Sequence, residues 1–202
     1  MSTQPLNVAI ITGSALQGRF SPVVTDWFVT RARERQDMVI DVIDLAETPI
    51  AQGFATAPDP GLADRLAAAD AFVIITPEYN HSFPAPLKHA IDLHVTEWQA
   101  KPIAFISYGG MSGGLRAIEQ LRLVFAELHA VTIRDTVSFH RVWECFDGTG
   151  NPKDPEVDTA ADLLLDRLAW WAHALRRARA ETPYDSSVKA SPPRRSPSGR
   201  PS

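Results

Sequence analysis

The sequence has few of the residues that build disulfide frameworks and zinc clusters, because its 202 residues include a single cysteine, Cys145. An intramolecular disulfide, a Cys-x-x-Cys redox pair and a cysteine-rich zinc site are therefore excluded, which favours a reducing, cytoplasmic location. The six histidines are scattered and form no HExxH motif, so we expect no metal site. Cys145 has no evident activating neighbour, and we expect an inert thiol.

Long apolar runs are also missing. The first apolar run, Val8 to Ile11, is far too short for a signal peptide or a membrane span, and no basic segment precedes it, so we expect neither export nor membrane insertion. Twenty basic residues against 24 acidic ones give a formal net charge of −4. This balance supplies no broad positive field, so we expect no nucleic-acid or membrane partner. Small molecules and other proteins remain as partners.

Most of the chain has an ordinary globular composition, with 45% hydrophobic residues. Residues 181–202 differ, because prolines, serines and arginines dominate there and large apolar side chains are almost absent. Such a segment cannot bury enough surface to offset the entropy lost on ordering. We therefore predict one domain, residues 1–180, followed by a disordered tail, residues 181–202. The tail is slightly basic and could contact anions, although a solvated linker is the simpler interpretation.

Short apolar runs alternate with longer amphipathic stretches along the domain. The runs predict five strands, at Leu6–Ile11, Met38–Ile43, Ala71–Ile75, Ile103–Ser107 and Val131–Val137. The longer stretches predict helices at Pro22–Arg35, Pro60–Ala69, Pro84–Val95, Gly114–Leu128 and Pro155–Ala180. Since parallel strands need crossover helices, the alternation indicates an α/β, doubly wound parallel sheet with helices on both faces. Five strands favour the flavodoxin-like order 2-1-3-4-5, whose ligand crevice lies at the carboxyl ends of strands 1 and 3.

The loop after the first predicted strand combines glycines, hydroxyls and one arginine just before a helix start. Free backbone N–H groups and the helix dipole make such a loop an anion site. A P-loop would need Lys and then Ser or Thr after its second glycine, but Arg19 and Phe20 follow Gly18, and no G-x-G-x-x-G fingerprint is present. A terminal phosphomonoester therefore fits better than ATP or a pyrophosphate. A plain strand-to-helix turn with an exposed arginine remains the alternative.

Two further loops are predicted at the same edge of the sheet. Residues 76–84 (TPEYNHSFP) offer an aromatic ring, amides and a carboxylate, which suits the flat, amphipathic head of a nucleotide. The alternative for this loop is a proline-bounded turn in which Tyr79 caps the core. Residues 108–114 (YGGMSGG) carry four glycines, which allow the backbone to approach a ligand closely.

The third loop also matches the G-x-S-x-G motif of hydrolases, with Ser112 at the nucleophile position. That chemistry needs an Asp and then a His on later, separate strands. Asp135 and His140 are too close in sequence to occupy the ends of separate strands. We therefore do not expect a hydrolase.

Together the three loops resemble the NADPH-dependent FMN reductase family, flavodoxin-like enzymes that include quinone, azo-dye and chromate reductases. The resemblance covers residues 7 to about 175. Its most specific part is PEYNHSFPAPLKHAID at 77–92, close to the family's PEYN-x-S-x-P-x-x-L-K-N-A-I-D. GGMSGGLRA at 109–117 is similar to the family's glycine loop, and WECFD at 143–147 is similar to the segment before its last helix.

The resemblance implies a bound FMN, with the phosphate in the loop of residues 14–21, the isoalloxazine ring against residues 77–80, and residues 107–110 at the ring edge. The cofactor-binding residues that it implies are Ser14, Arg19, Phe20, Ser21, Pro77, Glu78, Tyr79, Asn80, Ser107, Gly109 and Gly110. One position departs from the family, whose first loop usually has G-S-x-R. Leu16 stands here in place of that arginine, while Arg19 is retained.

The resemblance also implies a cytoplasmic oxidoreductase that transfers hydride from NADPH or NADH to the flavin and passes electrons to a quinone-like or other small soluble acceptor. The flavin carries the chemistry, so no catalytic side chain is nominated. A homodimer or homotetramer is expected, in which the helix at 84–95 and Trp98 beyond it give a partner apolar groups beside the flavin. Two alternatives stay open: an electron carrier or FMN-binding module without NAD(P)H turnover, and a reductase that releases reduced FMN to a partner monooxygenase.

Overall fold

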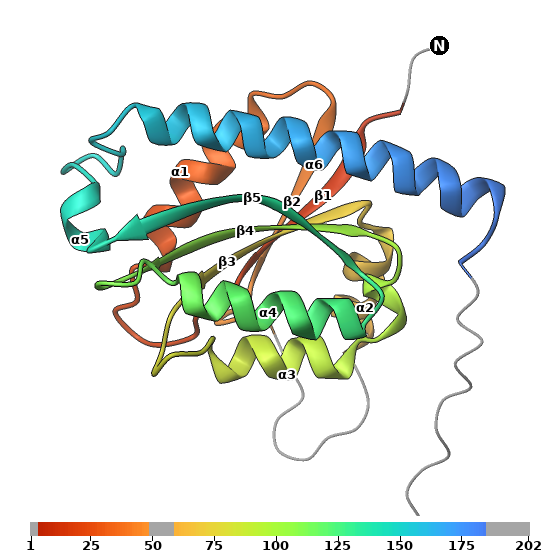
Figure 1. Ribbon diagram of the computed structural model, residues 1–202, viewed down its shortest axis with the longest axis horizontal. Coiled ribbons are helices and arrows are strands. Elements are labelled where there is room, and N and C mark those ends of the chain that lie inside the picture. The colour runs from red at the N-terminus through yellow and green to blue at the C-terminus, as the bar shows by residue number, and fades with distance from the viewer. Residues whose placement is uncertain (1–3, 49–58, 185–202) are drawn as a thin grey trace, which may run out of the picture.

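Five parallel strands form the centre of the molecule (Figure 1), in a computed structural model that describes residues 4–48 and 59–184. The order in the sheet is β2-β1-β3-β4-β5, which confirms the predicted flavodoxin-like order. All four neighbouring pairs run parallel. The strands are β1 (Leu6–Thr12), β2 (Met38–Asp44), β3 (Ala71–Pro77), β4 (Pro102–Gly109) and β5 (Val131–His140).

Helices connect the strands at the predicted places. The four-residue helix α5 was not predicted, because it is too short to show a helical period. None of the helices in residues 4–48 and 59–184 is long and apolar enough to cross a membrane. The helices are α1 (Ser21–Arg33), α2 (Pro60–Ala68), α3 (Ala85–Leu93), the 3-10 helix η1 (Thr96–Trp98), α4 (Leu115–Glu127), α5 (Val142–Cys145) and α6 (Glu156–Glu181).

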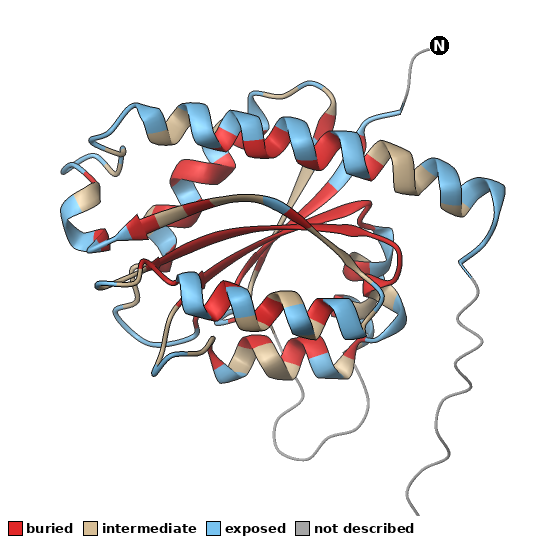
Figure 2. Cartoon of the chain, viewed as in Figure 1, coloured by how far each residue is buried: buried red, intermediate tan, exposed pale blue. Residues whose placement is uncertain are grey.

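The helices cover both faces of the sheet and enclose two apolar cores. In Figures 1 and 2, α1 and α6 lie on one face, and α3 and α4 lie on the other. Because side chains alternate along a strand, Val8 and Ile10 enter the first core, under α1 and α6. Ala9 and Ile11 enter the second core, on the opposite face of the sheet. Every residue of β3 is buried, as a central strand covered on both faces requires.

A row of polar contacts joins α1 to α6 across the first core. Three side chains on or just after α1, spaced four residues apart, reach three aspartates with the same spacing on α6. The contacts are Trp27 Nε1 to Asp158 at 2.9 Å, Arg31 Nη2 to Asp162 at 2.7 Å and Arg35 Nη1 to Asp166 at 2.5 Å. Helical residues four apart share a face, so the match in spacing fixes the register of the two helices.

The environment of Trp98 corrects one expectation. Trp98 is 1% exposed, and its ring centroid lies 4.7 Å from that of Phe72 and 5.4 Å from that of Phe125. The expectation that Trp98 offers a surface to a partner was therefore wrong. The 3-10 helix η1 turns the indole into the second core, a conformation that a three-residue segment does not reveal in its sequence pattern.

The chain beyond α6 is described only as far as Tyr184. The Tyr184 hydroxyl and His129 Nδ1 share a hydrogen bond of 2.7 Å. Residues 185–202, most of the predicted disordered tail, lie outside the described residues. The tail therefore stays a prediction.

Lys101 supports the amino edge of the sheet from a buried position. It is 7% exposed, and its Nζ donates to the carbonyls of Leu66 at 2.8 Å and Ala67 at 2.9 Å, in the last turn of α2. The same Nζ lies 5.5 Å from the centroid of the Phe72 ring. The ammonium thus satisfies helix carbonyls that have no partner within the helix.

Replacing Lys101 by methionine should lower the free energy of unfolding by about 1–3 kcal/mol, because the buried carbonyl of Leu66 and the partly buried carbonyl of Ala67 lose their donor. Urea denaturation measures this loss. Lys88→Met is the matched control, since Lys88 makes only an exposed pair with Asp92 and its loss should stay below about 0.5 kcal/mol. Equal losses in the two variants would contradict the capping role.

Candidate functional site

Three loops meet at the carboxyl edge of the sheet, where the winding direction reverses (Figure 1). They follow β1, β3 and β4 and each leads into a helix, at residues 13–20, 78–84 and 110–114. Such an edge is where ligands bind in doubly wound sheets. The topology therefore brings together the three segments that the sequence singles out.

Four hydroxyl groups connect the first loop and the start of α1 to the second loop and the end of β4. The hydroxyls of Ser14 and Tyr79 share a hydrogen bond of 2.7 Å, and those of Ser21 and Tyr108 share one of 2.5 Å. Both serines are fully buried. Burial raises the pKa of Tyr108, so its hydroxyl stays protonated at neutral pH. The sequence places Tyr108 in the third loop but indicates no role for its hydroxyl.

Arg19 is held by a neighbouring strand. Its Nη2 donates to Oδ2 of Asp44, the last residue of β2, at 2.6 Å. Its Nε is buried and has no hydrogen-bond partner within the described residues. A buried donor without a partner costs about 1–3 kcal/mol, so an acceptor that reached this N–H would be stabilising. The sequence indicated the arginine but gave no sign of Asp44.

Phe20 anchors the first loop by packing rather than by polar contacts. It is the residue before α1, and its ring centroid lies 5.7 Å from that of Phe146, just after α5. Phe146 in turn packs against Phe139 at 4.9 Å. Leu16, at the position of the family's arginine, is 58% exposed. The loop is therefore fixed at its end and open at its middle.

The second loop contains a tight turn. Tyr79 and Ser82 exchange two backbone hydrogen bonds, of 2.9 and 3.0 Å, and Asn80 and His81 between them have φ of 50° and 71°. Two consecutive positive φ values define a type I′ turn, which asparagine tolerates well. Gln120 of α4 fixes the turn, since it accepts from the Ser82 hydroxyl at 2.6 Å and donates to the His81 carbonyl at 2.7 Å.

Glu78 ties the second loop to the third. Its side chain is 5% exposed, it accepts from the Ser112 hydroxyl at 2.6 Å, and it pairs with Arg116. Burial raises the pKa of Glu78, but the hydrogen bonds from Ser112 and Arg116 outweigh that effect and leave the pKa below its ordinary value. Glu78, which follows Pro77 at the end of β3, is thus an ionised structural link.

The third loop folds back over the ends of β4 and β5. The hydroxyls of Ser107 and Ser138 both donate to the carbonyl of Gly113, at 2.7 and 2.8 Å. Gly113 and Gly114 have φ of 60° and 84°, a region that other residues enter only with strain. The buried Ser107 hydroxyl therefore supports the loop, and its side chain already has a partner inside the protein.

Gly109 and Gly110 form the partly exposed part of this loop. Gly109 ends β4, and the carbonyl of Gly110 accepts from the backbone N–H of Arg141 at 2.8 Å. Neither residue has a side chain that could hold a flat ligand away from the backbone. Both glycines therefore fit the ring-edge position that the resemblance implies for them.

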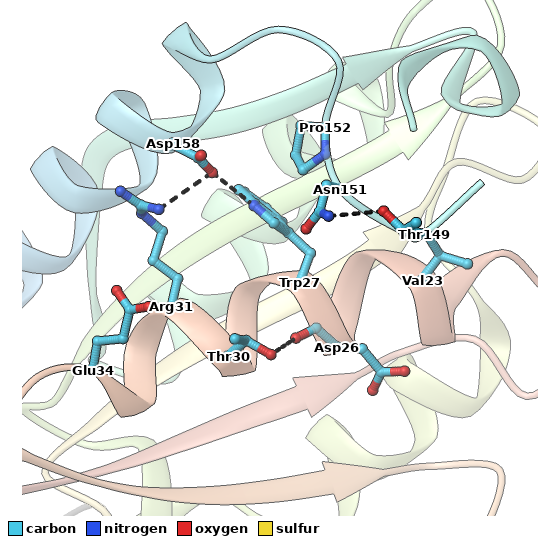
Figure 3. Close-up of a pocket in the computed structure, with 11 residues that line it drawn as sticks. Val23, Asp26, Trp27, Thr30, Arg31, Glu34, Thr149, Asn151, Pro152 and Asp158 are labelled. Carbon is cyan, nitrogen blue, oxygen red and sulfur yellow. Dashed lines mark hydrogen bonds and ion pairs between the residues drawn. The ribbon is translucent and has the colours of Figure 1, made fainter. Parts of the chain in front are cut away.

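Two open pockets flank α1. One, of about 510 Å³, lies between α1, residues 149–152 and the start of α6, and Figure 3 shows Trp27 and Arg31 both reaching Asp158 across it. The other, of about 620 Å³, is bordered by Arg19 and Asp44. Residues 77–80 and 107–110 line neither pocket. The pocket of about 620 Å³ borders the first loop through Arg19. The pocket of about 510 Å³ is a charged crevice between α1 and α6.

The chain is similar in sequence and in fold to known flavin-dependent reductases. Residues 6–144 match the NADPH-dependent FMN reductase family. A probable NADPH:quinone oxidoreductase 2 of Oryza sativa subsp. japonica is 32% identical over 190 residues, which are 84% of this chain and 91% of that protein. An NAD(P)H-dependent FMN reductase of Schizosaccharomyces pombe is 30% identical over 123 residues, 53% of this chain and 60% of that protein, so the match spans less than two thirds of that relative.

Among solved structures, FerB, a flavoenzyme NAD(P)H:(acceptor) oxidoreductase from Paracoccus denitrificans, superposes with a TM-score of 0.62 at 22% identity. The superposition covers 85% of this chain and 98% of FerB, and it confirms the flavodoxin-like fold. The family match spans more than half of the chain and includes all three loops at the carboxyl edge. On this evidence the chain belongs to the NADPH-dependent FMN reductase family.

Proposed function

We propose that the protein binds FMN across the three loops, transfers hydride from NADPH or NADH to it, and passes electrons to a quinone-like or other small soluble acceptor. One observation carries the placement of the cofactor: the buried Nε of Arg19, in the loop that leads into α1, has no hydrogen-bond partner among the residues that the structure describes. When bound, FMN supplies the electron-transfer chemistry. The protein binds and orients it, and no side chain is assigned a proton-transfer role.

The first loop fits a phosphate by the kind of groups it contains. Phe20, the residue before α1, makes no side-chain capping bond. Pro22 has no N–H, and the N–H of Val23 donates to the carbonyl of Phe20 at 3.2 Å, so the first turn offers an acceptor the N–H of Ser21 and the positive end of the helix dipole. Ser14 and Ser21 support this loop through their hydroxyl bonds to Tyr79 and Tyr108. Arg19 adds an N–H group and a positive charge that Asp44 holds in place. This set of donors suits a doubly charged phosphate, with Phe20 as the packing anchor of the loop.

The other two loops fit a flat ring. The type I′ turn fixes Tyr79 and Asn80, and Glu78 holds this turn against the third loop. The glycines at 109 and 110 have no side chain to hold a ring edge away from the backbone, and Pro77 lies beside them at the end of β3. We propose that residues 77–80 lie along the isoalloxazine and that residues 107–110 border it, with Ser107 acting through its support of the loop.

The visible spectrum of the purified protein tests this proposal. We expect flavin absorption that bleaches when NADPH or NADH is added without oxygen and returns when a quinone is added. A spectrum that neither nucleotide bleaches would instead support an electron carrier or FMN-binding module. Loss of FMN from the protein on reduction, measured by gel filtration, would support a reductase that serves a separate monooxygenase.

We also propose that the protein is a homodimer or homotetramer in the cytoplasm. The support is a set of exposed apolar side chains on and near the helices that follow the second and third loops: Val95, Leu115 and Leu123. Light scattering should give at least twice the mass of one chain at micromolar concentration. A monomer under these conditions would contradict this proposal and leave the FMN site unaffected.

A further inference from the structure

The short helix α5 carries an exposed indole on a buried base. Val142, the first residue of α5, and Phe146, just after its end, are 4% and 7% exposed, whereas Trp143 is 61% exposed. A single exposed tryptophan needs no explanation by itself. Two features distinguish Trp143: its backbone is held by hydrogen bonds, and its side chain contacts the third loop.

The backbone around Trp143 is fixed at both ends of α5. Arg141 has a φ of 51° and donates its N–H to the carbonyl of Gly110 at 2.8 Å. Lys153 donates its backbone N–H to the carbonyl of Cys145 and its Nζ to the carbonyl of Glu144, both at 2.9 Å. A left-handed arginine costs about 1–2 kcal/mol, and such strain is found where a side chain has to be aimed. The position of the backbone that carries the indole is therefore set by the chain on both sides.

The indole lies beside the third loop. A Cβ built on Gly110 would lie 3.7 Å from Cη2 of Trp143, so the tip of the ring reaches the backbone of this glycine. Met111, the next residue in the loop, is 94% exposed, and its carbonyl is 2.9 Å from Nδ1 of His140. Trp143 and Met111 thus form an apolar border along the loop that is proposed to meet the flavin edge.

We propose that Trp143 is a positioning residue for the electron acceptor, and that its indole packs against a flat, conjugated acceptor of the quinone class. This inference rests on the proposed function. In the net reaction NAD(P)H gives a hydride and solvent gives a proton, so that the quinone gains two electrons and two protons and leaves as a hydroquinone. Trp143 neither gains nor loses electrons. It holds the acceptor over the loop of Gly109 and Gly110.

Steady-state kinetics of the FMN-loaded enzyme test the inference with two acceptors. With 2-methyl-1,4-naphthoquinone, Trp143→Leu should raise KM about 2- to 10-fold, the range expected for the loss of one aromatic contact. With ferricyanide, which has no ring to stack, the KM should change less than about twofold. Trp170→Leu is the matched control, because Trp170 is 64% exposed but lies on α6. Trp170→Leu should change the KM for neither acceptor.

A binding measurement without turnover provides the second readout. In the oxidised, FMN-loaded protein without NAD(P)H, the naphthoquinone should quench part of the tryptophan fluorescence in a saturable way. Trp143→Phe should remove that saturable part and Trp170→Phe should keep it.

Three results would overturn the inference: an unchanged quinone KM, an equal rise with ferricyanide, or loss of FMN from Trp143→Leu. A parent protein that holds FMN but reduces no quinone would contradict the proposed function instead. Even then, the fluorescence measurement would still show whether a quinone binds at Trp143.

Discussion

Replacing Gly114 by alanine should lower the free energy of unfolding by about 2–5 kcal/mol, the sum of left-handed backbone strain and overpacking. Gly114 has a φ of 84°, and a Cβ there would lie 2.7 Å from Cβ of Ser107 and 3.0 Å from the backbone N and O of Tyr108. These neighbours belong to a central strand and cannot give way cheaply. Urea denaturation, with the midpoint and slope fitted separately, measures the loss.

Gly150→Ala separates the two contributions. Gly150 has a φ of 85°, almost the same as that of Gly114, but nothing lies within 4 Å of a Cβ built there. This control should therefore show the backbone strain alone, about 1–2 kcal/mol. If both variants lose the same free energy, the close approach of the third loop to β4 contributes nothing and the description of that loop is wrong.

Arg19→Ala should weaken FMN binding about 10- to 150-fold, the range expected when a charge-assisted hydrogen bond to the phosphate is lost. The buried Nε that lacks a partner is the group that would make this bond. Flavin fluorescence, titrated with protein freed of its cofactor, gives the dissociation constants. Riboflavin is the control ligand, because it has no phosphate and should bind both proteins alike.

Asp44 adds a second test at the same place. With Arg19 gone, the Asp44 carboxylate loses its 2.6 Å partner and leaves a negative charge beside the first loop. The double variant Arg19→Ala/Asp44→Asn should therefore bind FMN more tightly than Arg19→Ala. Leu16→Arg, which restores the family's arginine at an exposed position, should also tighten FMN binding. If Arg19→Ala weakens riboflavin as much as FMN, the phosphate is not held by this loop.

The layout of the sheet could be predicted because it follows from local pattern. The apolar runs and the helices between them leave few ways to pack, and a count of five strands favours the flavodoxin-like order. The edge at which the three loops meet is a consequence of that order. The structure confirms these features.

Features that depend on distant partners could not be predicted in this way. The pairing of Arg19 with Asp44 needs β1 and β2 to lie side by side, and the bond between Ser21 and Tyr108 spans 87 positions of the chain. The burial of Trp98 depends on rings from β3 and α4. The roles of Glu78 and Ser107 as links within the protein also became clear only when their partners were in place.

The row of contacts between α1 and α6 has a consequence for the order of synthesis. Its hydrogen bonds join residues 131 positions apart, so a ribosome that makes about 5–20 residues per second needs about 7–26 seconds to supply the second partner. During this interval, Val24 and Phe28 of α1 have no Leu164 or Leu168 to pack against. The nascent chain therefore lacks the α6 side of this core until its last helix leaves the exit tunnel, a window in which a chaperone could bind.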